Sequence, residues 1–464
     1  MNLPSSGQPD SLERRKLLAT LGALGLMGGA GMTGMLAPRL ARATEWQNWS
    51  GGQHASPAKI IYPANETELA AAVRDASGSI RAVGGGHSFS PVVPTTGTLI
   101  SLEAMNGLAG HDAAALTATF WAGTRIAMTG PLLKAVGQGL LNEADINTQS
   151  LGGAVSTSTH GTGRQLQSFS GTVKGLQLVL ADGSLVPCSA DHDADLFQAA
   201  RVAVGSIGIM SRITVQNREA YRLRENVTIM PITEAMSTID RDKDKHRHIE
   251  LWAFPFGGKA ILKRQDITTD AITVPEKPFI DENAILGFAA NTTRKMPWTN
   301  SLFQHLLGAF VSDSERVGNS FEIFPSLRTV QFNEMEYSVP AEHGLACLQE
   351  VMDVLKKNDV NVFFPIEFRY VAADDCWLSP FYQRATAAIS VHQYYKQDYR
   401  EVFDLVEPVF WKYQGRPHWG KLHRLEARQL RALYPRFEDF LRVRQRVDAN
   451  GRFLNPHARK LFLG

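Results

Sequence analysis

The order of apolar and polar positions predicts short strands and helices that alternate along the first half of the chain. Ile80 to Val83 is a β-rich run, and a capping sequence at 65–68 begins the apolar helical stretch that precedes it. Mixed short elements of this kind favour an α+β domain over a doubly wound parallel sheet. Further strands are predicted at 98–102, 116–121, 175–180 and 184–188, and further helices at 126–139, broken at Pro131, and at 195–202.

The pattern changes near residue 219. Aromatic and charged residues become more frequent beyond it, and alternating runs at 249–254 and 329–337 predict an antiparallel sheet flanked by helices. Residues 265–320 are predicted to form an insertion with an amphipathic stretch near 302–310. We therefore expect two domains of different architecture.

The domain boundaries follow from this change and from the N-terminal segment. We predict a targeting segment over 1–43, a first domain over 44–218 and a second over 219–464. A dense charge run from Asp240 to His248 predicts a solvated turn rather than a metal site built on its histidines.

Residues 1–43 have the features of an export signal. An arginine pair at 14–15 precedes an apolar stretch rich in glycine and alanine, and residues 41–43 supply an A-x-A cleavage site. The pattern resembles a twin-arginine signal, which predicts export to the periplasm by the twin-arginine translocase. An uncleaved membrane anchor is the alternative.

Composition adds few constraints. The chain has 464 residues, of which 44% are hydrophobic and 20% charged, as in ordinary soluble domains. The net charge is +2, and residues 1–43 carry five basic against two acidic residues, so the remainder is about −1 and offers no basic footprint for nucleic acid. Cys188, Cys347 and Cys376 lie far apart without CxxC spacing. This pattern argues against a disulfide framework or a zinc site and leaves one bridge open; no metal site is predicted.

Three consecutive glycines, Gly84, Gly85 and Gly86, follow the first predicted strand. Because they lack Cβ atoms, their backbone can turn sharply and bring main-chain N–H groups close to an anion such as a pyrophosphate. His87 and Ser88 follow at the lip of this turn. Taken alone, the segment is equally consistent with a tight turn that carries a surface histidine.

A second segment favours a ligand site. Residues 147–163 contain almost no bulky or charged side chains and carry hydroxyl groups at nearly every second position. A core strand would hold larger residues, and a disordered linker would hold more charge or proline. We expect a wall that lies against a planar polar ligand. Two such segments imply a ligand with both phosphate and ring portions, and a flavin dinucleotide fits.

Together the two segments resemble the FAD domain of the vanillyl-alcohol-oxidase superfamily, the PCMH-type FAD-binding fold. The motifs are V-G-G-G-H-S-F-S-P from residue 83 and S-L-G-G-A-V-S-T-S-T-H-G-T-G from residue 150. The likeness is greatest to the D-arabinono-1,4-lactone and L-gulonolactone oxidases, with the alditol oxidases. It implies an α+β, two-domain PCMH-type FAD-binding fold whose cap domain is an antiparallel sheet flanked by helices. It also implies that the chain returns to the FAD domain at about 440–464.

The resemblance also implies which residues hold FAD. In the oxidases of this branch, the histidine at the position of His87 bonds covalently to the flavin; noncovalent FAD with His87 as a hydrogen-bond donor is the alternative. Cofactor contacts are implied at Gly84, Gly85, Gly86, His87, Ser88, Ser150, Gly152, Gly153, Ser156, Thr157, His160, Gly161 and Ile209.

Glu367 and Arg369 are the first candidates for catalysis. Two positions apart on a predicted strand, they project to the same face among apolar neighbours, where an ion pair costs desolvation. From the residues alone, a structural ion pair is the alternative. The resemblance implies that Arg369 stabilises negative charge on the reduced flavin and that Glu367 fixes the substrate hydroxyls. It adds Ser150, His392 and Lys421 to the site; Glu367, His392 and Lys421 are the candidate bases.

These features predict FAD-dependent oxidation of a CH–OH group in a sugar-derived lactone, with hydride transfer to flavin N5 and reoxidation by O2 to hydrogen peroxide. An alditol oxidase that acts on a linear polyol would share the same residues. The residues also leave open a dehydrogenase that passes electrons to a periplasmic carrier, and a non-catalytic flavin-binding protein.

Overall fold

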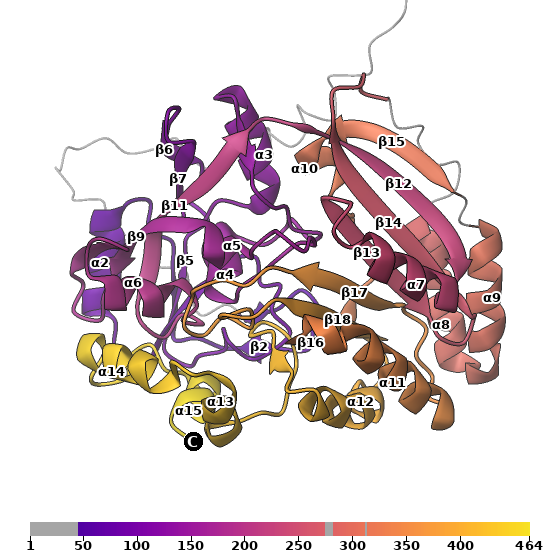
Figure 1. The fold of residues 1–464 in the computed structure, drawn as a ribbon. Helices are drawn as coiled ribbons and strands as arrows, with labels where there is room; N and C mark the ends of the chain where they lie inside the picture. Colours follow the sequence, from indigo (N-terminus) through magenta and orange to yellow (C-terminus); the bar gives the residue numbers. More distant parts are fainter. Residues whose placement is uncertain (1–44, 274–281, 311–312) are drawn as a thin grey trace, which may run out of the picture. The chain divides into compact units, whose positions relative to one another are not determined.

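The computed structural model describes residues 45–273, 282–310 and 313–464 (Figure 1). The predicted targeting segment lies outside these residues. The helices and strands of the first half are β1 (Trp46–Gln47), β2 (His54–Ala55), β3 (Lys59–Ile61), α2 (Glu66–Asp75), β4 (Ile80–Val83), β5 (Thr98–Ser101), β6 (Leu108–Asp112), β7 (Thr117–Trp121), α3 (Ile126–Ala135), β8 (Gln138–Leu140), α4 (Leu151–Ser156), α5 (Phe169–Thr172), β9 (Val173–Val179), β10 (Leu185–Ser189), α6 (Ala194–Arg201) and β11 (Ile209–Glu219).

Two sheets organise this half. Strands β3, β5 and β4 form a parallel sheet in that order, and β10, β9, β11, β7 and β6 form an antiparallel sheet to which β8 adds by pairing with β11. Helix α2 begins where the capping sequence predicts, because the Asn65 side chain accepts a hydrogen bond from Glu68 N at 2.9 Å. Strand β4 ends at the triple glycine, so the predicted strand-to-glycine turn is present.

The prediction of a helix broken at Pro131 is wrong. Helix α3 continues through Pro131, ends at Ala135 and is followed by strand β8. Its first turn is hydrogen-bonded to another segment of the chain: Ile126 N donates to Gln149 O, and Ala127 N donates to Asn147 O. These tertiary bonds hold the helix in place despite the bond that proline removes.

The second half contains one large sheet. Its elements are β12 (Arg222–Pro231), α7 (Ile232–Asp242), β13 (His248–Phe254), β14 (Lys259–Thr268), α8 (Glu282–Lys295), η1 (Pro297–Thr299), α9 (Asn300–Phe310), β15 (Ser314–Asn319), α10 (Ser320–Ile323), β16 (Phe332–Pro340), η2 (Ala341–His343), α11 (Gly344–Lys357), β17 (Ile366–Val371), β18 (Thr386–Tyr394), α12 (Arg400–Lys412), β19 (Arg416–Pro417), α13 (Ala427–Leu433), α14 (Phe437–Val447) and α15 (Pro456–Phe462). Among the described residues, eight of these strands form a sheet in the order β15-β12-β14-β13-β17-β18-β16-β19.

The two faces of this sheet differ. Helices α7, α11 and α12 pack against one face (Figure 1), where Leu251, Phe368 and Ile389 are buried. Because successive side chains alternate between faces, the neighbouring positions Glu250 and Glu367 point to the opposite side. The α+β fold with an antiparallel second sheet flanked by helices is confirmed.

Two predictions about the second half need correction. Residues 265–320 are not wholly an insertion, because they include the end of β14 and the edge strand β15 that pairs with β12; α8 and α9 lie between them.

The second correction concerns the charge run from Asp240 to His248, which is solvated only in part. His248 begins β13, is buried, and its Nδ1 lies 2.7 Å from Thr162 O. Burial, with Arg247 nearby, lowers the pKa of His248 to about 3.

The C-terminal segment contacts the first half of the chain. Arg452 Nη2 donates to Val73 O at 2.8 Å and to Ala76 O at 2.6 Å, while Ile80 N donates to Arg452 O. Asn455 Nδ2 donates to Pro91 O at 2.9 Å. The last residues of the chain are thus hydrogen-bonded next to the strand that leads into the triple glycine.

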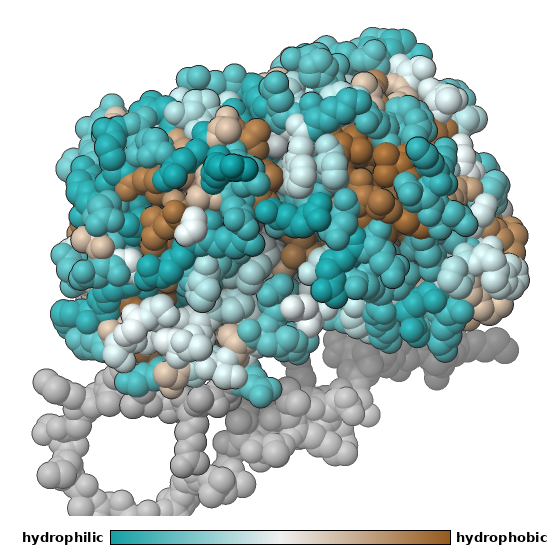
Figure 2. Space-filling view, turned by 90° about the horizontal axis from the view of Figure 1, so that it is seen from below, coloured by the Kyte–Doolittle hydropathy of each residue, from teal (hydrophilic) through white to brown (hydrophobic). Residues whose placement is uncertain are grey.

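Most of the face in Figure 2 is hydrophilic, with apolar residues in separate patches. Within the part of the chain that the structure describes, none of the helices has both the length and the apolar character needed to span a bilayer.

Candidate active site

A large cavity lies between the two halves of the chain. Its volume is about 1660 Å³, above the roughly 300–1,000 Å³ of most small-molecule sites. The triple glycine and α4 supply part of its wall, and β13, β16, β17 and β18 supply another part. The cavity therefore has room for a dinucleotide and a substrate together.

The triple glycine makes a close approach that side chains would block. A Cβ atom on Gly84 would lie 1.8 Å from Ser150 Oγ, and one on Gly85 would lie 2.8 Å from Thr148 O. Gly86 has a φ of 63°, in the left-handed region that favours glycine. Glycine is therefore required here both by space and by backbone conformation.

Ser150 stands at the contact between the two predicted flavin segments. It caps α4 by accepting a hydrogen bond from Gly153 N at 3.3 Å. The hydroxyl-rich wall is partly helical. In it Ser156 Oγ donates to Gly152 O and Thr157 Oγ1 donates to Gly153 O. These two hydroxyls are thus already paired with the main chain, although both residues line the cavity.

His87 lies in the cavity wall with an unpaired ring nitrogen. Its Nε2 is buried and has no hydrogen-bond partner among the described residues, and its ring centroid is 4.5 Å from that of Trp49. Burial, and then the positive charge of Lys421, lowers the pKa of His87 to about 4. The imidazole is therefore neutral at neutral pH and keeps a lone pair.

The predicted cofactor residues do not all reach the cavity. Gly161 lies behind the wall, where a Cβ atom would meet Glu143 O at 2.2 Å. The cavity is lined by the other predicted cofactor residues, namely Gly84, Gly85, Gly86, His87, Ser88, Ser150, Gly152, Gly153, Ser156, Thr157, His160 and Ile209.

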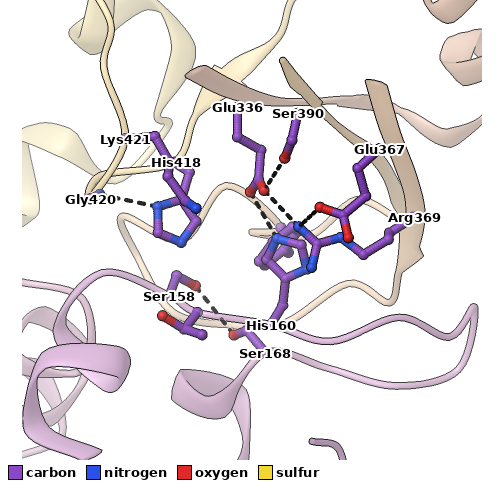
Figure 3. Close-up of polar contacts among 12 residues, drawn as sticks. Ser158, His160, Ser168, Glu336, Glu367, Arg369, Ser390, His418, Gly420 and Lys421 are labelled. Carbon is purple, nitrogen blue, oxygen red and sulfur yellow. Dashed lines mark hydrogen bonds and ion pairs between the residues drawn. The ribbon is translucent and has the colours of Figure 1, made fainter. Parts of the chain in front are cut away.

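Glu367 and Arg369 lie on β17 and face the cavity, as their spacing predicts. Arg369 Nη2 donates to Glu336 Oε2 at 2.8 Å and forms an ion pair with Glu367 Oε2 at 3.2 Å (Figure 3). Burial raises the pKa of Glu367 to about 7, although Arg369 opposes the shift. One carboxyl in the site can therefore exchange a proton near neutral pH.

Lys421 and His392 meet at a further carboxylate. Lys421 Nζ forms an ion pair with Glu334, and His392 Nε2 lies 3.5 Å from Glu334 Oε1. Burial alone would raise the pKa of Glu334, but Lys421 and His392 hold it below its usual range. Ligand atoms of Glu334, Glu367 and His392 come within 4.8 Å of one another. Because Lys421 and Arg369 supply cations to these carboxylates, we assign no metal ligand among them.

A main-chain contact brings the Lys421 segment to the glycine turn. Phe89 N donates to Gly420 O at 2.7 Å, and Lys421 Nζ lies 5.1 Å from the centroid of the Phe89 ring. His418, in the same segment, is buried beside Glu336, and burial lowers its pKa to about 3. The four polar catalytic candidates of the second half, Glu367, Arg369, His392 and Lys421, line one cavity with Ser150.

Several polar residues of the cavity were not predicted from the sequence. Glu334 and Glu336 stand two apart on β16, and both are buried. This is the same spacing that identified Glu367 and Arg369, so charged residues two apart in an alternating strand were the available signal. Other polar cavity residues that were not predicted as site residues include His418, Asp145, Trp252 and Lys263, which lie in separate segments and meet only through the fold.

The residues present fit FAD. The glycine turn is a cradle that side chains would fill, the buried Nε2 of His87 lacks a partner among the described residues, and the cavity exceeds the size of most small-molecule sites. The residues of Gly84 to Ser88 and of Ser150 to Thr157 would hold the cofactor from two sides.

Comparison with known proteins identifies the family. Residues 213–461 match the model of D-arabinono-1,4-lactone oxidase, and residues 57–189 match that of an FAD binding domain. The chain belongs to the D-arabinono-1,4-lactone oxidase family. It thus combines an FAD-binding domain with the C-terminal half that defines this family.

Relatives with named activities match nearly the whole of this D-arabinono-1,4-lactone oxidase family chain. L-gulono-1,4-lactone dehydrogenase of Mycobacterium tuberculosis is 33% identical over 90% of this chain and 98% of its own length. L-gulonolactone oxidase of Mus musculus is 28% identical over 91% and 99%. Alditol oxidase of a Streptomyces species is 28% identical over 91% and 100%.

Solved structures show the same fold at lower identity. Cholesterol oxidase from Brevibacterium sterolicum superposes with a TM-score of 0.78 over 94% of this chain and 99% of its own, at 15% identity. At that identity the likeness establishes the fold alone.

Proposed function

We propose that this protein oxidises a CH–OH group of an aldono-1,4-lactone with FAD. The observation that carries the proposal is the buried Glu367–Arg369 pair, which faces the same cavity as the glycine turn and His87. Relatives named for L-gulono- and D-arabinono-1,4-lactone support the choice of substrate class. Bound FAD supplies the acceptor for the two electrons that leave the substrate carbon.

The side chains of this chain supply charge and a proton acceptor. Arg369 stays cationic, because Glu367 and Glu336 raise its pKa against the effect of burial. Its fixed charge favours negative charge that develops beside it during the reaction. Glu367 in its ionised form accepts the proton of the substrate hydroxyl, which its pKa of about 7 allows near neutral pH. Lys421 and His392 hold Glu334 and so form the polar border of this end of the cavity.

We further propose that His87 bonds covalently to FAD. Support comes from its neutral imidazole, its buried and unpartnered Nε2 and its position at the glycine turn. Acid precipitation of the purified protein should leave the yellow colour in the pellet, and His87→Ala should release it to the supernatant. Release from the unaltered protein would disprove the covalent bond and leave FAD binding standing.

The proposed electron acceptor is O2, with hydrogen peroxide as product. A relative that is named a dehydrogenase, at 33% identity, favours a redox carrier as the second candidate. The ratio of peroxide formed to lactone consumed decides between them: a ratio near one supports O2, and a ratio near zero with reduction of an added cytochrome supports a carrier.

The alditol oxidase relative favours a linear polyol as the second substrate class. L-gulono-, L-galactono- and D-arabinono-1,4-lactone should be tested beside xylitol and sorbitol under the same conditions. We expect higher kcat/KM for a lactone; higher values for both polyols would move the proposal to the alditol branch.

We also propose export to the periplasm by the twin-arginine route, on the strength of the arginine pair at 14–15 and the A-x-A sequence at 41–43. Replacement of both arginines by lysine should retain the protein in the cytoplasmic fraction of the producing cell. Unchanged fractionation would contradict this route, and a full-length protein in the membrane fraction would favour the uncleaved anchor.

A further inference from the structure

Glu336 is a fully buried carboxylate that receives three side chains from three segments of the chain. His160 Nε2 lies 2.9 Å from its Oε1, while Arg369 Nη2 at 2.8 Å and Ser390 Oγ at 2.6 Å donate to its Oε2 (Figure 3). His160 follows α4 in the first half, whereas Arg369 and Ser390 lie on β17 and β18. Glu336 therefore connects the segment that follows α4 to the strands β17 and β18.

Glu336 and Glu367 compete for one nitrogen of Arg369. The shorter contact of Nη2, a hydrogen bond of 2.8 Å, goes to Glu336, and Glu367 lies 3.2 Å from the same atom. Glu367 Oε1 is buried without a hydrogen-bond partner among the described residues. Glu336 therefore has polar partners at both carboxylate oxygens, whereas Glu367 Oε1 has none among the described residues.

We infer that Glu336 is a positioning residue: it holds the Arg369 guanidinium and the His160 ring in place and keeps Arg369 from fully neutralising Glu367. This inference rests on the proposed function, in which Glu367 accepts the substrate proton. Glu336 lines the cavity, and in this role it acts through the two side chains that it holds.

The charges around both carboxyls support this division. Burial would raise the pKa of Glu336, but His160 and Arg369 hold it well below its usual range, whereas Glu367 keeps a pKa of about 7. Two carboxyls whose surroundings separate their pKa values take different roles. The charged and titratable groups around Glu367 are Arg369 on the same strand and, from other segments, Asp145, Glu250, Glu334, Glu336 and His392. Further charged and titratable groups of this region are His160 and His418 beside Glu336, Lys421 beside Glu334, and Lys263 beside Glu250.

The sign of the expected change follows from charge. Removing the negative charge of Glu336 frees Arg369 to hydrogen-bond Glu367, and an opposite charge favours the ionised carboxyl. The pKa of Glu367 should therefore fall by about one unit or more in Glu336→Gln, within the one to three units typical of an adjacent arginine.

The test follows the visible absorption of the FAD-loaded protein with pH, without substrate, because the flavin band responds to charge near the ring. We expect a transition near pH 7 that is absent in Glu367→Gln and lies at least one unit lower in Glu336→Gln. Glu407→Gln is the matched control: Glu407 is also buried, also accepts three hydrogen bonds, from Tyr337 and twice from Arg424, and does not line the cavity. Its transition should match that of the unaltered protein.

An unshifted transition in Glu336→Gln would overturn the inference, as would a transition that survives Glu367→Gln or the absence of any transition in the unaltered protein. Glu336→Asp provides a second variant if Gln prevents folding, and its smaller downward shift is expected because the shorter side chain retracts from Arg369. If the proposed function were wrong, no lactone would reduce the flavin, and that result does not depend on the pH transitions.

Discussion

At the scale of single residues, Arg369 is the fixed charge on which the site depends. It is buried between Glu336 and Glu367, so its positive charge is held in place before any substrate binds. Arg369→Ala should lower the rate of flavin reduction by about a hundredfold, as expected for loss of one preorganised donor. Stopped-flow mixing with lactone under anaerobic conditions measures this rate.

Arg369→Lys is the matched variant, because it keeps the charge and loses the planar fork that contacts both carboxylates. We expect an intermediate rate for it. Equal rates for the unaltered protein and Arg369→Ala would remove Arg369 from the mechanism and return the pair to a structural role.

Glu367 gives a prediction about stability and pH. Its pKa is raised to about 7 in the folded protein, above the usual 4.5, so folding favours the protonated form. The stability that this provides is fully present below about pH 4.5 and is lost as pH rises through 7. The unfolding free energy from urea denaturation should therefore fall less between pH 5 and 8 in Glu367→Gln than in the unaltered protein.

Glu367→Gln removes this ionisation, so the difference between the two curves reports the titration of Glu367 together with its coupling to neighbouring groups. Parallel curves would show that Glu367 does not change its protonation between pH 5 and 8 and would withdraw it as a base with a pKa near neutrality.

At the scale of elements, the turn from β4 into the glycines determines whether the cofactor is held. Gly84→Ala places a methyl group 1.8 Å from Ser150 Oγ, so the turn or α4 must move. We expect a several-fold lower FAD content per protein, measured from the ratio of visible to ultraviolet absorption. Gly110→Ala on β6 is the control, because nothing lies within 4 Å of its added Cβ among the described residues.

A full FAD content in Gly84→Ala would mean that the close approach of the turn to α4 is not needed for binding. A loss shared by Gly110→Ala would mean that the effect is general instability.

The elements that could be predicted from sequence are those with local signals. The glycine turn, the capped helix α2 and the Glu367–Arg369 strand are each recognisable within a few residues. Helix α3 could not be predicted beyond Pro131, because its first turn is fixed by bonds to 147 and 149, which are far along the chain. The contacts of Glu336 could not be predicted from the sequence, because only the pairing of β16 with β18 places Ser390 opposite it.

At the scale of the whole molecule, the C-terminal segment contributes to the first half as part of its structure. Arg452 donates to the carbonyl oxygens of Val73, Ala76 and Ala181. Arg452→Met should lower the unfolding free energy by about 3 kcal/mol, since three acceptors lose a charged donor. Chemical denaturation measures this change.

Arg428→Met, on the exposed side of α13, is the control and should change stability little. A loss in Arg452→Met no larger than that of the control would mean that the C-terminal contacts do not hold the first half.

The two-part α+β fold was predictable because its motifs are long and specific. The strand order β15-β12-β14-β13-β17-β18-β16-β19 was not predictable, because it pairs segments far apart in sequence. Hydrophobic periodicity indicates which face of a strand is buried but not which strands lie next to it. That order decides which charged residues share the cavity. Glu334 and Glu336 have the same spacing as Glu367 and Arg369, but only this order, with β18 between β16 and β17, brings the two pairs together.

The most direct test of lactone oxidation is anaerobic mixing of the purified yellow protein with L-gulono-, L-galactono- or D-arabinono-1,4-lactone while the visible flavin absorption is followed. We predict bleaching by at least one lactone, at a rate that Arg369→Ala lowers about a hundredfold. A flavin that stays oxidised with every lactone, or a protein that binds no FAD, would contradict the proposed activity.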